Sequence, residues 1–301
     1  MPKLIKFETT DKLLLPGLLY EPDKKTKKAA FYLHGNGGSS IFDSVVRTNT
    51  LAKELNNRGI AFMPFDNRGA KLVNGLDSTD PRQETKQMFG SGFEIIKDCQ
   101  KDIDGAIAYL KTLGYETFYL IGQSTGANKG AVYNFYKPKN EVDKFVLTGP
   151  GDDTGLYYKM LGPKQFSDLL SEARNQTKVG NGAKLSSQAL KFDEYMSFQS
   201  LYDTMNPDGD YNTYPFYEYK NNLDLSSKKL FQEFSSIKKP VLIVYGSEDE
   251  YCDGAKEAVE ILKEKSGNPT LFESKIIAGA DHGFHGFEKQ IAQEIAKWLV
   301  K

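Results

Sequence analysis

The chain has 301 residues, enough to bury a large core in one α/β domain or in two smaller domains. Its 39 basic and 40 acidic residues nearly balance, so we expect no nucleic-acid partner and no strongly charged surface for an anionic membrane. Two cysteines and three dispersed histidines do not have the spacing of a metal site or a disulfide framework. We therefore expect no metal and no other cofactor.

The N-terminal residues lack the apolar stretch of a signal peptide. No run of the chain approaches the roughly 18 apolar residues of a membrane-spanning helix. We expect a soluble, cytoplasmic protein in which Cys99 and Cys252 are reduced thiols. The sequence leaves the oligomeric state open.

The predicted elements begin with a hairpin and then alternate between strands and helices. Apolar runs at 4–7 and 13–20 predict an antiparallel hairpin at the edge of a sheet, with Pro16 at an edge position. Apolar residues at three- and four-residue spacings predict helices over 93–113 and 287–300. Buried strands joined by helices imply an α/β fold, with a mostly parallel sheet covered on both faces. The later strands are predicted at 29–33, 60–65, 117–121, 144–147, 241–245 and 271–277.

Residues 151–235 interrupt this alternation, with helical periodicity at 155–175 and 186–205. A structureless loop of this length is improbable in a compact domain. We predict a helical cap inserted over the carboxyl edge of the sheet, where open α/β sheets bind ligands. Residues 1–150 and 236–301 would then form the core domain.

Aromatic residues crowd this inserted segment, and two interpretations of them remain open. The rings either pack the cap onto the sheet or line an apolar acyl pocket. Tyr157 and Tyr195 are candidates for contact with a substrate.

The segment Gly122-Gln123-Ser124-Thr125-Gly126 carries the clearest chemical signal. It follows a short apolar strand and precedes a helix rich in small residues, so it predicts a sharp strand-to-helix turn with a serine at its apex. Such a turn strains the serine backbone and requires glycine on both sides. The serine hydroxyl then lies at a helix N-terminus, where backbone N–H groups can stabilise developing negative charge.

A serine nucleophile needs a base, which the chain can draw only from three histidines. His282 lies in a loop between the last strand and the last helix and is the preferred base. His285, three residues later, is a loop or cap residue that could line the site. His34 opens a glycine-rich loop and is expected to be structural. In that loop, Gly35 would let the backbone approach a ligand closely.

The base in turn needs an orienting carboxylate, expected after the penultimate strand. Asp249 is preferred, and Glu248, Glu250 and Asp253 are close rivals in the same acidic loop. Asp281 adjoins the histidine in sequence, which makes a bridge between the two side chains awkward.

With these motifs the chain resembles the α/β-hydrolase superfamily over nearly its whole length. The order Ser124, Asp249, His282 is the order that this fold uses. The resemblance implies that these residues are nucleophile, acid and base. It also implies that the backbone N–H groups of Asn36 and Thr125 form the oxyanion hole.

Asp66-Asn67-Arg68-Gly69 is similar to a motif that follows the fourth strand in this superfamily, and we expect it to brace the oxyanion loop. The amino-acid sequence of residues 62–70 is also similar to that of a branch of the superfamily that includes fungal siderophore-ester hydrolases.

These features predict a serine hydrolase that cleaves carboxylic esters of small to medium substrates through an acyl-enzyme. Peptidases, amidases, thioesterases and C–C bond hydrolases that use the same triad remain alternatives. A non-catalytic binding module is a further alternative, which the intact triad disfavours. An interfacial lipase is disfavoured because charged residues run through the inserted segment.

Overall fold

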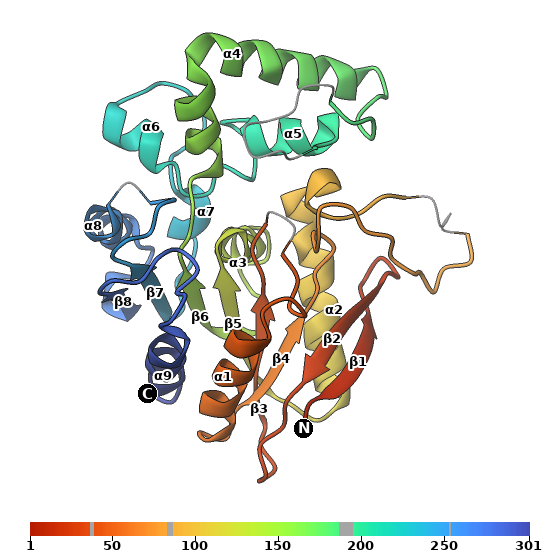
Figure 1. The fold of residues 1–301 in the computed structure, drawn as a ribbon, viewed down its shortest axis with the longest axis vertical. Coiled ribbons are helices and arrows are strands. Elements are labelled where there is room, and N and C mark those ends of the chain that lie inside the picture. Colours follow the sequence, from red (N-terminus) through yellow and green to blue (C-terminus); the bar gives the residue numbers. More distant parts are fainter. Residues whose placement is uncertain (37–38, 83–86, 187–194, 253) are drawn as a thin grey trace.

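The computed structural model describes residues 1–36, 39–82, 87–186, 195–252 and 254–301. At its centre lies an eight-stranded sheet with the order β1-β2-β4-β3-β5-β6-β7-β8 (Figure 1). β2 pairs antiparallel with β1 and with β4, and all other neighbours pair parallel, which confirms the predicted α/β fold. The strands are β1 (Lys3–Glu8), β2 (Leu14–Leu19), β3 (Lys28–Leu33), β4 (Ala61–Phe65), β5 (Thr117–Gln123), β6 (Val142–Thr148), β7 (Val241–Gly246) and β8 (Phe272–Ile277).

Helices lie on both faces of the sheet (Figure 1). Two of them pack against each other on one face, and three contribute buried side chains to the other. They are α1 (Val45–Asn56) and α9 (Glu288–Leu299) on the first face, and α2 (Cys99–Thr112), α3 (Thr125–Tyr136) and α8 (Ala255–Lys265) on the second. No helix within the described ranges is long and apolar enough to cross a membrane.

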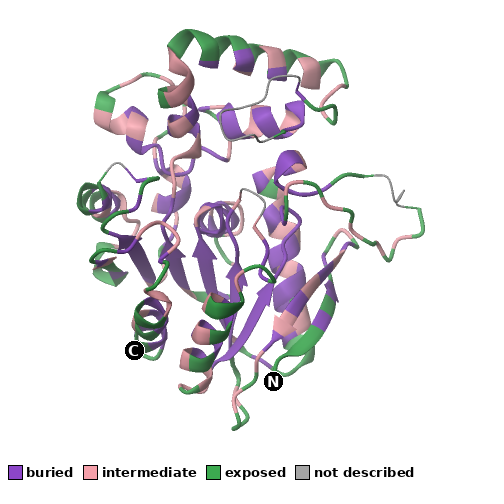
Figure 2. Ribbon diagram, viewed as in Figure 1, coloured by how far each residue is buried: buried purple, intermediate pink, exposed green. Residues whose placement is uncertain are grey.

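Strand β3 shows how the sheet separates two apolar cores. Phe31 and Leu33 point into one buried cluster, whereas Ala30 and Tyr32 point into the other. This follows from the alternation of side chains along a strand. Because both faces are covered, almost every residue of the central strands is buried (Figure 2).

The N-terminal hairpin forms as predicted, but the edge position predicted for Pro16 is wrong. β2 lies between β1 and β4, so the outermost strand is β1. Proline lacks an N–H donor and would interrupt a continuous ladder. Here proline is tolerated because the ladder between β2 and β4 is short: the two strands pair only at Gly17 and Phe65. The carbonyl oxygen of Pro16 accepts the N–H of Asp66 at 2.9 Å.

The helix predicted over 93–113 begins later than its apolar spacing suggested. α2 starts at Cys99, after two 3-10 turns, η1 (Ser91–Phe93) and η2 (Ile96–Asp98). Between these turns the backbone is extended at Glu94 and Ile95, so no single helix runs through them. A third 3-10 turn, η3 (Pro269–Leu271), precedes β8.

Helices occupy the described part of the segment between β6 and β7, at the top of Figure 1. The helix predicted over 155–175 is present as α4, which bends at Gly162 where φ is 74°. The helix predicted over 186–205 is present only as α5, and residues 187–194 lie outside the described ranges. The helices are α4 (Asp153–Lys178), α5 (Phe198–Met205), α6 (Phe216–Asn221) and α7 (Gln232–Ser235).

Apolar packing divides this inserted segment into two parts. Side chains between Tyr157 and Met205 form a small buried cluster of their own. Aromatic rings further along the segment belong instead to the larger cluster under the sheet; they are Tyr211, Tyr214, Phe216, Phe231 and Phe234. The later part is therefore anchored on the core domain.

The first part of the segment docks onto the residues before α2 through polar groups. The N–H of Ser197 donates to the carbonyl oxygen of Gly92 at 2.7 Å. The carboxylate of Asp203 accepts the N–H of Ile96 at 2.8 Å. These bonds use the backbone groups that the extended residues around η1 and η2 leave available.

Burial raises the pKa of Asp203 to about 7, although the Ile96 N–H lowers it. The nearby carboxylates of Asp210, Glu94 and Asp98 add to the rise. Because the carboxyl binds its proton more tightly in the folded chain, its contribution to stability is lost as pH rises from about 4 towards 7.

We predict that Asp203→Asn stabilises the protein more at pH 8 than at pH 5. Asparagine keeps an oxygen for the Ile96 N–H but never ionises. The gain in unfolding free energy should be larger at pH 8 by about 1–2 kcal/mol. Urea denaturation at both pH values measures it, with the exposed Asp168→Asn on α4 as control. An equal change at the two pH values would contradict the prediction.

Candidate active site

Ser124 lies at a sharp turn between β5 and α3. Its backbone has φ 53° and ψ −127°, a conformation that residues other than glycine rarely adopt. A Cβ at Gly122 would lie 2.3 Å from the carbonyl oxygen of Gly126, and a Cβ at Gly126 would lie 2.1 Å from that of Leu33. Glycine is therefore required at both positions, and the turn places Ser124 at the N-terminus of α3.

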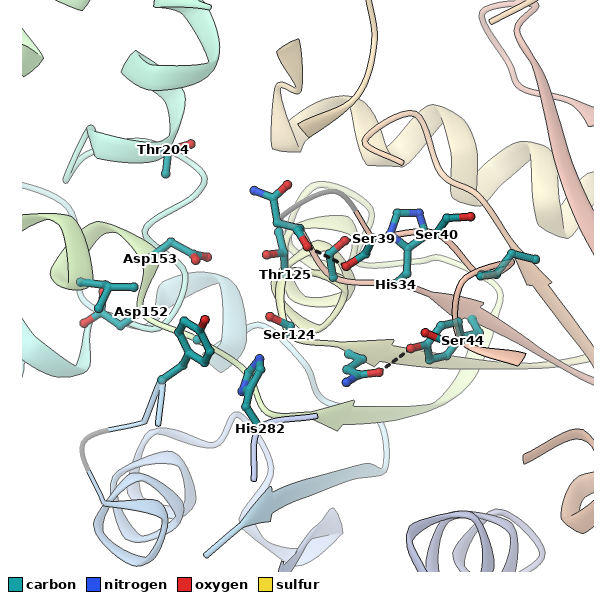
Figure 3. A pocket seen from close by; sticks show the side chains of 18 of the residues that line it. His34, Ser39, Ser40, Ser44, Ser124, Thr125, Asp152, Asp153, Thr204 and His282 are labelled. Atoms are coloured by element: carbon teal, nitrogen blue, oxygen red, sulfur yellow. Dashed lines mark hydrogen bonds between the residues drawn. The ribbon is translucent and has the colours of Figure 1, made fainter. Parts of the chain in front are cut away.

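Two backbone segments approach Ser124 from different elements. Thr125 is the first residue of α3, so its N–H has no partner within the helix. Gly35, after β3, is so close that a Cβ there would lie 2.9 Å from the Cβ of Ser124. Asn36, Thr125 and Ser124 line the same cavity (Figure 3). The structure thus brings the residues assigned to the oxyanion hole together with the serine.

His282 and Asp249 form a hydrogen-bonded pair. Nδ1 of His282 lies 2.9 and 3.0 Å from the two carboxylate oxygens of Asp249, whose side chain is completely buried. Gly149 passes beside this pair with φ 55°, and a Cβ there would lie 3.0 Å from Cε1 of His282. The preceding carbonyl, that of Thr148, accepts the N–H of Ser124 at 2.8 Å. The pair therefore lies next to the serine turn.

The rival carboxylates of the acidic loop are placed differently. Glu248 is exposed, and its carboxylate accepts the hydroxyl of Ser247. Glu250 is also exposed and accepts the backbone N–H of His282 at 3.1 Å, not a ring nitrogen. Asp253 lies outside the described residues. The side chain of Asp249 is buried and its carboxylate faces Nδ1 of His282, so Asp249 is favoured as the partner of the imidazole.

His285 lies apart from the cavity. Its ring Nδ1 contacts the carboxylate of Asp281 at 2.7 Å, and its side chain is 75% exposed. His285 is not among the described residues that line the cavity. Asp281 is thus engaged with His285 and not with the ring of His282.

His34 supports the loop as a neutral histidine. Nδ1 lies 2.7 Å from the carbonyl oxygen of Gly35, so it carries the hydrogen, and Nε2 accepts the N–H of Asn67 at 3.1 Å. Burial, together with the charge of Lys129, lowers its pKa to about 3. His34 is therefore uncharged at neutral pH and fixes the start of the glycine-rich loop.

The Asp66-Asn67-Arg68-Gly69 motif holds the same loop from the neighbouring strand. The carboxylate of Asp66 accepts the N–H of Ile41 at 2.8 Å and the hydroxyl of Ser40 at 2.9 Å. Arg68 is buried and pairs with Asp102 at 2.7 Å. These contacts agree with a bracing role for the motif.

The candidate site opens into a cavity of about 510 Å³ (Figure 3). Among the described residues, its aliphatic lining is limited to Ile41 and Leu156. Asp152, Asp153 and Arg47 bring charge to the wall. Hydroxyl groups form most of the rest, from Tyr32, Ser39, Ser40, Ser44, Ser124, Thr125, Tyr157, Thr204 and Tyr251. The cavity suits a polar molecule better than a long alkyl chain.

The aromatic residues of the inserted segment are mostly used in packing. Tyr157 lines the cavity, and it also joins Phe166 and Phe198 in the small apolar cluster. Tyr195 is exposed and does not line the cavity within the described residues. Phe192 lies outside the described ranges. The packing interpretation of these rings is therefore favoured over an aromatic acyl pocket.

Sequence reasoning missed Arg47 and Tyr251. Arg47, on α1, donates to the side-chain oxygen of Gln123 and, at 2.5 Å, to the carbonyl oxygen of Gly283. It thus ties the residue before Ser124 to the loop that carries His282. The ring of Tyr251 packs on the imidazole of His282 with 4.7 Å between centroids. No motif marks either residue, because both act through spatial contacts between distant segments.

The described residues contain no cluster of three histidine, cysteine or acidic side chains placed to hold a metal ion. Cys99 and Cys252 are both buried thiols. Burial raises the pKa of Cys99 well above its usual value, so this thiol is not ionised at neutral pH.

Solved structures of several hydrolases resemble this chain over nearly its whole length. Est1E from Butyrivibrio proteoclasticus has a TM-score of 0.59 at 14% identity, covering 99% of this chain and 97% of that one. A soluble variant of the Saccharomyces cerevisiae monoglyceride lipase has a TM-score of 0.61 at 16% identity, with 99% and 94% covered. An esterase of Pyrococcus furiosus has a TM-score of 0.61 at 17% identity, with 99% and 90% covered. At these identities the likeness establishes the fold.

No curated protein matches the chain. The similarity to siderophore-ester hydrolases therefore stays a prediction. The family described as "Protein of unknown function (DUF1749)" matches residues 72–301. The chain belongs to this family and has the α/β-hydrolase fold.

Proposed function

We propose that this protein is a serine hydrolase that cleaves carboxylic esters through an acyl-enzyme. One observation carries the proposal: Ser124, at its strained turn, shares a cavity with His282, which is bonded to the buried Asp249. Esterases and lipases among the structures of similar fold support ester cleavage as the reaction class.

In the proposed reaction, the hydroxyl oxygen of Ser124 attacks the ester carbonyl carbon while His282 takes the hydroxyl proton. Since Nδ1 of His282 is bonded to Asp249, Nε2 is the nitrogen that accepts this proton. Asp249 holds the ring orientation and stabilises the imidazolium. His282 then protonates the leaving alcohol, and water repeats the sequence on the acyl-enzyme.

The negative charge that develops on the carbonyl oxygen requires nearby donors. We assign this role to the N–H groups of Asn36 and Thr125, which line the same cavity as Ser124. Such donors stabilise the transition state more than the ground state, and loss of one costs about 10²–10³ in rate.

We also propose that residues 151–235 form a cap over this site. Tyr157 on α4 and Thr204 on α5 contribute to the cavity wall, so the segment encloses the substrate. The many hydroxyl groups and the scarce aliphatic lining favour small to medium, polar acyl or alcohol groups.

Ser124→Ala should abolish hydrolysis of p-nitrophenyl acetate and butyrate. Removal of the nucleophile should lower kcat by at least about 10⁴-fold. The same change should abolish covalent labelling by a fluorophosphonate, which reacts through an activated serine. As a control, Ser274→Ala removes an exposed hydroxyl on β8 and should leave both activities unchanged. Full activity of Ser124→Ala would refute the proposal.

Asp249→Asn should show which carboxylate of the acidic loop is the triad acid. Asparagine keeps the shape but loses the charge that stabilises the imidazolium, so kcat should fall by about 10³–10⁴-fold. Glu248→Gln is the matched control, since its carboxylate is exposed and bonds only Ser247 among the described residues. Steady-state kinetics on p-nitrophenyl butyrate compares the two. The assignment fails if Glu248→Gln is the more damaging change.

The polar lining predicts a short optimum acyl length. An apolar acyl pocket would gain about 0.8 kcal/mol, or roughly fourfold, for each added methylene. Here kcat/KM for p-nitrophenyl esters should stop rising by butyrate and fall towards octanoate. A hydroxycinnamate ester belongs in the same panel, because the similar Est1E has been solved with ferulic acid bound. A steady rise up to octanoate would contradict the prediction.

A further inference from the structure

Tyr211 lies behind the candidate oxyanion hole rather than in the cavity. It belongs to the inserted segment, is 1% exposed and packs in the main apolar cluster. Among the described residues that line the cavity, Tyr211 does not appear. Any effect on the reaction must therefore pass through the residues that its hydroxyl touches.

The hydroxyl of Tyr211 contacts Asn36, one of the two residues assigned to the oxyanion hole. The side-chain amide of Asn36 donates to it through Nδ2 at 2.8 Å. One oxygen atom thus links the inserted segment to the loop after β3.

The contact with Tyr211 is what orients the amide of Asn36. The other end of that amide, Oδ1, is buried and has no hydrogen-bond partner within the described part of the chain. The backbone of Asn36 is fixed by a different contact, because its carbonyl oxygen accepts the hydroxyl of Ser39 at 2.7 Å. Side chain and carbonyl together fix the direction of the Asn36 N–H.

Burial raises the pKa of Tyr211 well above the usual value for tyrosine, and the charge of Asp153 adds to this. Thr125 opposes the rise. The phenol is consequently protonated at neutral pH, and its oxygen accepts the Asn36 amide as a neutral hydroxyl.

We infer that Tyr211 is a positioning residue that, through the side chain of Asn36, sets where the Asn36 N–H lies relative to the reacting oxygen. This inference rests on the proposed function. It makes the inserted segment part of the catalytic apparatus, because a residue far from the core motifs in sequence determines the geometry of the oxyanion hole. Preorganised donors act only when they are aimed at the transition-state oxygen, so small displacements matter.

Tyr214 offers a matched control three residues away. It is equally buried, packs in the same cluster, and its hydroxyl has no hydrogen-bond partner among the described residues. Tyr211→Phe and Tyr214→Phe each remove one buried oxygen from a tyrosine of the same segment. Only the first change breaks the link to Asn36.

The test compares the two variants by ester kinetics and by inhibition with a trifluoromethyl ketone, whose serine adduct carries an oxyanion. Tyr211→Phe should lower kcat about tenfold with little change in KM, and should raise the Ki of the ketone by a similar factor. Tyr214→Phe should match the wild type in both. A kcat and Ki for Tyr211→Phe equal to those of Tyr214→Phe would overturn the inference.

A second approach covers the case in which Tyr211→Phe does not fold. Asn36→Ala retains the backbone N–H group but removes the side chain that meets Tyr211. It should weaken ketone binding, and an unchanged Ki would overturn the inference. Where Tyr211→Phe does fold, its effect should be less than additive with that of Asn36→Ala.

Measurements on the wild-type protein distinguish a failure of the positioning role from a failure of the proposed function. If wild-type Ser124 cleaves esters while the Tyr211 variants behave normally, the positioning role is wrong and the proposed function stands. If the wild type neither cleaves any ester nor reacts with a fluorophosphonate, the proposed function fails and the positioning role falls with it.

Discussion

The close approach of α3 to the ends of β3 and β5 is the constraint on which the rest of the structure depends. The helix begins so near these strands that a Cβ at Gly122 or Gly126 would run into backbone atoms. This contact forces Ser124 to φ 53° and exposes its side chain at the helix start. The local strain is stabilised by the packing of a whole helix against a buried sheet.

The surroundings of that turn are held by buried polar pairs rather than by apolar packing alone. Lys129, on α3, pairs with Glu94 at 2.6 Å, and both side chains are almost completely buried. Its ammonium group also donates to the side chain of Asn67, whose N–H in turn reaches His34. A chain of hydrogen bonds therefore connects α3, which begins beside Ser124, to the glycine-rich loop after β3. Removal of one partner would leave a buried charge without compensation.

The sequence was sufficient to predict the features that depend on local pattern. Continuous apolar runs predicted the sheet, and the glycine pair around Ser124 predicted the turn, because both are dictated by backbone sterics and side-chain periodicity. The acidic loop could not be resolved in this way. Glu248, Asp249 and Glu250 differ in burial and direction, and those depend on how the loop meets the loop of His282.

Features that arise from contacts between distant segments escaped sequence reasoning. The apolar spacing before Cys99 is helical, but the chain there forms two 3-10 turns, and the N–H of Ile96 donates to Asp203 of the inserted segment. Arg47 and Tyr211 have no motif, since their roles follow from the atoms that the fold brings to them. The crowded aromatic rings suggested a pocket from composition, whereas the structure uses most of them as core.

The separate apolar cluster between Tyr157 and Met205 has a consequence for protein engineering. None of its members takes part in the two cores that stabilise the sheet, so substitutions there leave the packing of both cores unchanged. Tyr157 and Thr204 come from this region and shape the cavity wall. The wall of the cavity can therefore be redesigned separately from the sheet and its covering helices. Directed evolution of the cavity would begin with this part of the molecule.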